Sequence, residues 1–142
     1  METKMLISRK GVAYQVEGIA VPEVLDLLRE PVNFFDVREP KDYSLAAVDH
    51  PSLQNIPILT LLEKLESFDR NQKYLIVDMD GTLAWKAANM LLYNDFRDVH
   101  FIAGGMIQWK NSGQPIKGRL ADLLSDCHDG SSCGGCSCGC ND

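Results

Sequence analysis

The first 126 residues of this 142-residue chain contain no cysteine, because all five cysteines lie between positions 127 and 140. No disulfide can therefore cross-link the larger part of the chain, and the odd number leaves at least one thiol unpaired in an oxidising compartment. Reduced thiols fit this distribution better. The first ten residues also lack the apolar stretch and the cleavage site of a secretory signal, so we expect a cytoplasmic location.

The chain also lacks long apolar runs and an excess of basic residues. No run approaches the roughly 20 apolar residues that cross a bilayer. Fourteen Lys and Arg stand against 20 Asp and Glu, which gives a formal net charge of −6. Because nucleic-acid binding requires clustered positive charge, we expect neither a nucleic-acid partner nor a membrane. With 45% hydrophobic and 24% charged residues, the composition is that of one globular domain.

Short apolar runs alternate with helical patterns along the chain. Three runs have the composition of strands in a sheet that is covered on both faces, at 32–37, 73–78 and 99–102. Four segments have the apolar spacing or the flanking residues of helices, at 22–29, 59–68, 82–93 and 105–111. This alternation predicts an α/β fold in which helices flank a parallel sheet. Residues 5–8 and 12–16 are expected to form a hairpin before it.

Four segments between residues 20 and 116 resemble the rhodanese-like family, the single-domain sulfurtransferase fold, in order and in spacing. They are Asp36-Val37-Arg38 with Tyr43, Asn55-Ile56-Pro57-Ile58, Lys86-Ala87-Ala88-Asn89-Met90-Leu91, and Gly104-Gly105-Met106-Ile107-Gln108-Trp109 with Gly113-Gln114-Pro115-Ile116. The resemblance implies a rhodanese-like domain over residues 1–118. It also implies that Asp36 and Arg38 form a salt bridge that braces the active-site loop.

In that family, the active-site loop begins with a catalytic cysteine at the end of a strand and then opens a helix. The resemblance places the loop at Asp78, Met79, Asp80, Gly81, Thr82, Leu83 and Ala84. Asp78 then occupies the cysteine position, and a carboxylate cannot form a persulfide, so we expect no catalytic residue in the domain. The Asp78 carboxylate is expected to take the N–H groups that would otherwise hold a persulfide. Alternatively, Asp78 and Asp80 are only a strand end and a helix cap.

Residues 75–83 also resemble the first motif of the haloacid dehalogenase superfamily. That resemblance implies a phosphatase in which Asp78 is the nucleophile, Asp80 is the acid/base and magnesium is bound. The superfamily also needs a later lysine and a late acidic pair. Only 60 residues follow Thr82, and no two adjacent acidic residues occur among them. This context argues against a phosphatase, which stays an alternative to the rhodanese-like interpretation.

Residues 119–142 differ from the rest of the chain. They are expected to form a flexible tail, disordered without a ligand, since residues 129–140 contain no large apolar side chain. The tail holds every cysteine of the chain: Cys127, Cys133, Cys136, Cys138 and Cys140. Thiolates at this spacing suit zinc or copper(I). Two other interpretations are that a tail thiol carries persulfide sulfur and that the tail has no dedicated ligand.

Together these observations predict a rhodanese-like protein whose domain lacks thiosulfate sulfurtransferase activity. We expect a binding or regulatory module, with no cofactor in the domain and a thiol- or metal-handling tail. Its partner would be a protein or a thiol or sulfur carrier. Sulfur transfer through the tail cysteines and a phosphatase that uses Asp78 and Asp80 are the alternatives.

Overall fold

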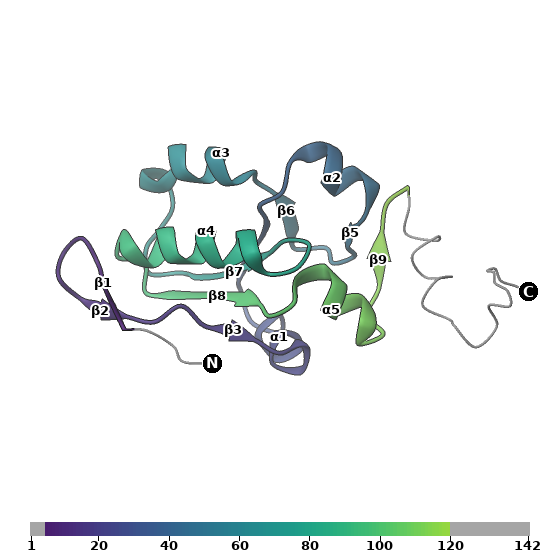
Figure 1. Cartoon of the computed structure of the whole chain (residues 1–142), viewed down its shortest axis with the longest axis horizontal. Coiled ribbons are helices and arrows are strands. Elements are labelled where there is room, and N and C mark those ends of the chain that lie inside the picture. The colour runs from purple at the N-terminus through teal and green to yellow at the C-terminus, as the bar shows by residue number, and fades with distance from the viewer. Residues whose placement is uncertain (1–4, 120–142) are drawn as a thin grey trace, which may run out of the picture.

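The structure, a computed structural model that describes residues 5–119, is built around a parallel sheet of five strands (Figure 1). The strands lie in the order β3-β8-β7-β4-β6, and every neighbouring pair is parallel. Their bounds are β3 Gly18–Ile19, β8 Asp98–Ile102, β7 Lys73–Val77, β4 Asn33–Asp36 and β6 Leu53–Asn55. The predicted α/β class and the predicted parallel sheet are confirmed.

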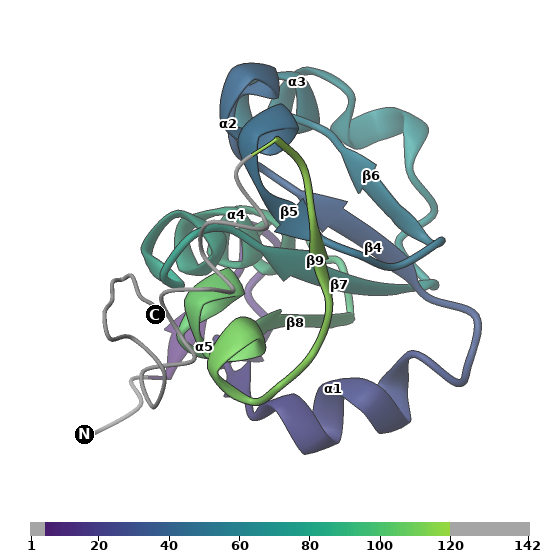
Figure 2. The same cartoon turned by 90° about the vertical axis from the view of Figure 1, so that its right-hand side faces the viewer.

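Helices cover both faces of this sheet, as Figure 2 shows. Their bounds are α1 Val21–Leu27, α2 Pro40–Leu45, α3 Ile58–Glu63, the 3₁₀ turn η1 Leu65–Ser67, α4 Thr82–Tyr93 and α5 Gly105–Asn111. Side chains of β7 alternate between the two faces. Tyr74 and Ile76 pack in the core beneath α3 and α4, whereas Leu75 and Val77 pack in the core with α1 and α5. The central strand is therefore apolar on both sides.

Two predicted helices, 82–93 and 105–111, agree with α4 and α5. The helix predicted over 59–68 is wrong in its second half, because α3 ends at Glu63 and a 3₁₀ turn follows. The N–H of Lys64 is shared between the carbonyls of Thr60 and Leu61, a bond that tightens the last helical turn.

Two small antiparallel pairs accompany the main sheet. The predicted hairpin is present as β1 Leu6–Ile7 and β2 Ala13–Tyr14, with shorter strands than predicted. A second pair, β5 Ala47–Val48 with β9 Ile116–Lys117, was not predicted. Within residues 5–119, no helix is long and apolar enough to cross a membrane.

Candidate functional site

The carboxyl end of β7 leads into the loop that the sequence singled out. Carboxyl ends of parallel strands meet at one edge of a sheet, which is where α/β folds place ligands. β7 ends at Val77, and α4 begins at Thr82. Gly81 turns the chain between them with a φ of 100°, a left-handed conformation that favours glycine. Of the seven predicted loop residues, the last three therefore form the first turn of α4.

The side chain of Asp78 lies inside this loop and is only 3% exposed. Its Oδ1 accepts the N–H of Gly81 at 2.5 Å, and its Oδ2 accepts the N–H of Leu83 at 2.7 Å. Burial raises the pKa of the Asp78 carboxyl above its ordinary value; the N–H groups of Gly81, Leu83 and Ala84 oppose this effect, and the charge of Asp80 adds to it. The carboxylate thus takes the N–H groups that open α4, which is the arrangement predicted for it.

Asp80 caps the same helix from outside. Its Oδ1 accepts the N–H of Thr82 at 3.0 Å. Hydrogen bonds from the backbone and the hydroxyl of Thr82 lower the pKa of this exposed carboxyl. Between the two aspartates, Met79 is 41% exposed. The loop therefore presents a thioether and a carboxylate to solvent, and the helix-cap interpretation holds for Asp80 alongside the interior role of Asp78.

The N-terminus of α5 packs against the backbone of the same loop. The N–H of Met106 donates to the Asp78 carbonyl at 2.8 Å, and that of Ile107 donates to the Met79 carbonyl at 3.1 Å. Gly105 allows this close approach: a Cβ there would lie 2.6 Å from Met79 C and O and from Asp80 N. The path of the loop is thus fixed by main-chain bonds as well as by the Asp78 side chain.

Asp36 and Arg38 form the predicted salt bridge. Arg38 Nη2 lies 2.8 Å from Asp36 Oδ2, and both side chains are buried. The same Nη2 donates to the Ala46 carbonyl at 2.6 Å, and the N–H of Val37 donates to the Val77 carbonyl at 3.2 Å. The pair ties the end of β4 to the residue that precedes β5. Bracing of the loop at 78–84 by this pair stays a prediction.

A comparison with protein-family models identifies the fold. The model of the rhodanese-like domain matches residues 20–112. This span contains the four strands β8, β7, β4 and β6 of the main sheet, the Asp78 loop and both helices that meet at it, and it begins just after β3. The chain belongs to the rhodanese-like domain family. The family that four sequence segments resembled is therefore confirmed.

Solved structures of rhodanese-like proteins superpose on this chain. A rhodanese-like domain protein from Staphylococcus aureus has 30% identity and a TM-score of 0.60, covering 72% of this chain and 99% of its own. A rhodanese-related protein from Thermoplasma volcanium has 24% identity and a TM-score of 0.62, covering 71% and 97%. An NAD-dependent persulfide reductase from A. fulgidus has 29% identity and a TM-score of 0.53, covering 66% of this chain but 16% of its own.

The predicted tail site lies outside the described residues. It comprises Cys127, Cys133, Cys136, Cys138 and Cys140, so a metal or persulfide role for these thiols stays a prediction. Within the part of the chain that the structure describes, no group of three or more His, Cys, Asp or Glu side chains is placed to hold a metal ion.

Ser8 and Asp95 form a polar contact that no sequence motif indicated. The Ser8 hydroxyl donates to Asp95 Oδ1 at 2.7 Å, across 87 residues of sequence. Asp95 has a φ of 69°, the left-handed conformation common just after a helix. The pair Asn94-Asp95 at the end of a helical pattern is a turn signal, but it does not reveal Ser8 as the partner.

Proposed function

We propose that this rhodanese-like domain binds a partner and does not transfer sulfur from thiosulfate. In this proposal Asp78 occupies the position of the catalytic cysteine, and thiol or metal chemistry belongs to the cysteine-rich tail. The partner is a protein or a thiol or sulfur carrier. Because the tail thiols require a reducing compartment, a cytoplasmic location is part of the same proposal.

The observation that carries this proposal is the engagement of both oxygens of the buried Asp78 carboxylate by the N–H groups of Gly81 and Leu83. N–H groups that converge at a helix N-terminus suit an anion such as a thiolate or a persulfide. Here a carboxylate already takes them, and a carboxylate cannot accept sulfur as a persulfide. Asp80 at the same loop would repel a thiosulfate anion.

Sulfur transfer through the tail cysteines is the second candidate. The likeness to part of a persulfide reductase favours it, because a rhodanese-like unit occurs there beside persulfide chemistry. In this candidate a tail thiolate accepts the sulfur, and the domain positions the donor or the acceptor. The zinc or copper(I) alternative uses the same five thiols, so the two roles compete for one set of ligands.

The phosphatase alternative receives less support from the geometry. A carboxylate nucleophile needs a free oxygen toward the phosphate, whereas both oxygens of Asp78 accept hydrogen bonds from its own loop. Asp80, the acid/base of that alternative, uses one oxygen to cap α4. Magnesium-dependent release of phosphate from p-nitrophenyl phosphate would support this alternative; an unchanged rate in an Asp78→Asn variant would remove it.

A thiosulfate:cyanide sulfurtransferase assay tests the proposal. It compares the full-length protein with a full-length variant in which the five tail cysteines are serine. We expect no turnover in the serine variant. Turnover that survives the five substitutions would overturn the proposal. Turnover in the wild-type protein that the substitutions abolish would select the second candidate, with the tail as the sulfur carrier.

A further inference from the structure

Three segments that are far apart in the sequence meet beside the C-terminal end of α4 and line a hollow of about 170 Å³. They are the turn of the β1–β2 hairpin with Arg9 and Lys10, the stretch from η1 to Arg70, and the residues that follow α4. The N–H of Arg9 donates to the carbonyl of Tyr93, the last residue of α4, at 3.0 Å. Because the Asp78 loop lies at the N-terminal end of α4, the two sites are separate.

Two arginines of this hollow are anchored to the same residue, Asn94. Arg9 Nη1 donates to the side-chain oxygen of Asn94 at 3.0 Å, and Arg70 Nε donates to its main-chain carbonyl at 2.7 Å. The Arg70 guanidinium also lies over the ring of Phe96, 5.0 Å from the ring centre, a favourable contact for a cation. The fold itself therefore brings two positive charges to one place.

The terminal nitrogens of Arg70 already face a carboxylate, but at long distances. Arg70 Nη1 and Nη2 lie 3.4 and 3.3 Å from the two oxygens of Glu66. Strong arginine–carboxylate pairs of this fork-like kind have N–O distances of about 2.7–2.9 Å. The Glu66 side chain is 80% exposed, so solvent screens the pair and holds its contribution to stability low. Glu66 therefore marks a position for an oxyanion without occupying it tightly.

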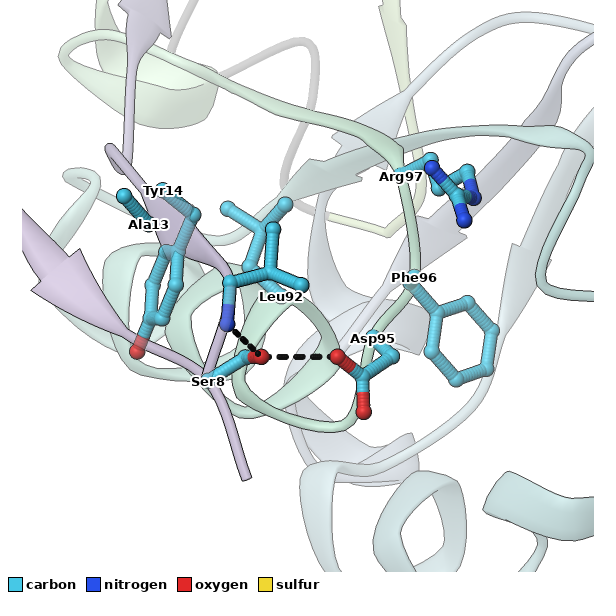
Figure 3. A pocket seen from close by; sticks show the side chains of 8 residues that line it. Ser8, Ala13, Tyr14, Leu92, Asp95, Phe96 and Arg97 are labelled. Carbon is cyan, nitrogen blue, oxygen red and sulfur yellow. Dashed lines mark hydrogen bonds between the residues drawn. The ribbon is translucent and has the colours of Figure 1, made fainter. Parts of the chain in front are cut away.

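The hollow offers further N–H donors. Among residues 5–119, the Lys10 ammonium forms no hydrogen bond, and the guanidinium of Arg9 uses only Nη1. The other carboxylate of the lining, Asp95, is already engaged: its Oδ1 accepts the Ser8 hydroxyl, as Figure 3 shows, and its Oδ2 is closed off from solvent. Three basic side chains thus line the hollow with one enclosed carboxylate and one loosely held carboxylate, in a chain whose net charge is −6.

We propose that this hollow binds the phosphate group of a phosphate monoester. The group would displace Glu66 and accept hydrogen bonds from Arg9, Lys10 and Arg70. A phosphate monoester carries a charge of about −1.5 to −2 at neutral pH and has three acceptor oxygens, whereas a carboxylate has one charge and two oxygens. It therefore suits three cations better than a carboxylate does. Since a water molecule takes about 30 Å³, the hollow has room for about five such groups, enough for the phosphate but not for the rest of the ester.

The test is an NMR titration of the ¹⁵N-labelled full-length protein at neutral pH with inorganic phosphate, acetate and chloride at equal ionic strength. We expect phosphate to shift the amide signals of Arg9, Lys10, Arg70 and Asn94 with saturation. Acetate and chloride should bind more weakly. Absence of saturable shifts with phosphate, or equal affinity for acetate or chloride, would overturn the proposal.

Two monoesters then distinguish the possible sources of the phosphate group. They are glycerol 3-phosphate and a capped Gly-Gly-phosphoserine-Gly-Gly peptide. Tighter binding of the peptide would assign the hollow to a phosphorylated protein, and equal or weaker binding of the peptide would assign it to a small phosphate ester. Failure of both monoesters to shift the same amide signals would overturn the proposal.

Two variants identify the charged contacts. Lys10→Gln should weaken phosphate binding about fivefold, and its exposed side chain makes no contact that folding would lose. Arg29→Gln, an exposed cation beyond α1, is its control and should leave binding unchanged. Glu66→Gln removes the competing carboxylate and should tighten phosphate binding about threefold, whereas Glu63→Gln at the exposed end of α3 should not. Unchanged affinity in Lys10→Gln, or unchanged or weaker binding in Glu66→Gln, would overturn the proposal.

Discussion

Helices α4 and α5 begin in the same way but are capped by different atoms. Each follows a central parallel strand, and each is preceded by a left-handed glycine, Gly81 with a φ of 100° and Gly104 with a φ of 80°. At α4, the N–H of Leu83 donates to the side chain of Asp78. At α5, the N–H of Met106 donates to the main-chain carbonyl of the same Asp78. One residue therefore caps both helices, once through its side chain and once through its backbone.

This difference separates the shape of the loop from its chemistry. The backbone cap of α5 is available to any residue at position 78, so the loop keeps a support that a substitution does not remove. The side-chain cap of α4 depends on which anion residue 78 supplies. Under the function proposed above, the domain keeps the backbone cap of α5, whereas a carboxylate replaces a thiolate in the side-chain cap of α4. Such an exchange removes sulfur chemistry and leaves the fold in place.

Substitution of Gly105 by alanine should have the largest effect, because it disrupts the backbone-capped junction. The added Cβ would lie 2.6 Å from Met79 and Asp80 backbone atoms, and the φ of 63° adds strain. We expect a loss of about 3 kcal/mol in the free energy of unfolding, measured by urea denaturation. Gly113→Ala is the matched control, since it has a φ of 86° with no atom within 4 Å. It should lose about 1 kcal/mol. Equal losses would contradict the tight junction.

Substitution of Asp78 by alanine disrupts the side-chain-capped junction. It leaves the N–H groups of Gly81 and Leu83 without an acceptor, so we expect a loss of about 2 kcal/mol in the free energy of unfolding. Relief of the buried charge offsets part of this loss. Asp80→Ala, which removes the exposed cap of the same helix, should lose less in the same denaturation experiment. A larger loss in the free energy of unfolding for Asp80→Ala than for Asp78→Ala would contradict the expectation that the buried carboxylate stabilises the junction more than the exposed one.

The pH dependence of stability should show the smallest of these effects. Because burial raises the pKa of Asp78, the folded protein binds this proton more tightly than the unfolded chain does. The resulting stabilisation is full below the ordinary aspartate pKa of 3.8 and is lost as the pH rises through the raised value. The wild-type protein should therefore lose stability relative to Asp78→Asn over this range, in parallel urea denaturations. A difference that grows in favour of the wild-type protein with rising pH would contradict the sign.

The sequence predicted those parts of the fold whose pattern is long or chemically distinctive. The apolar run at 73–78 and the helical pattern at 82–93 correspond closely to β7 and α4. The engagement of the Asp78 carboxylate by loop N–H groups was predicted because the family resemblance places Asp78 just before a helix. The N-terminus of a helix favours a negative charge.

Other features left no readable signal. Strands β3, β5 and β9 have two residues each, too short for an alternating pattern to be recognised. The hydrogen bonds from α5 to the loop join main-chain atoms, which every residue carries, so the sequence does not reveal them. The feature of the sequence that is tied to them is Gly105, because a larger residue would not fit against the loop backbone. The contact between Ser8 and Asp95 depends on where the hairpin lies relative to α4, and tertiary packing decides that position.

The most direct test of the central claim is an NMR pH titration that follows the carboxyl carbon of Asp78 together with the amide signals of Gly81 and Leu83. Burial raises the pKa of Asp78 more than the N–H groups lower it, so the midpoint for Asp78 should lie above 3.8. Because this carboxylate accepts the N–H groups of Gly81 and Leu83, both amide signals should move with the same midpoint. The signal of Asp80 serves as the internal reference, with a midpoint below 3.8. A midpoint for Asp78 at or below that of Asp80, or amide signals of Gly81 and Leu83 that ignore the Asp78 titration, would contradict the account.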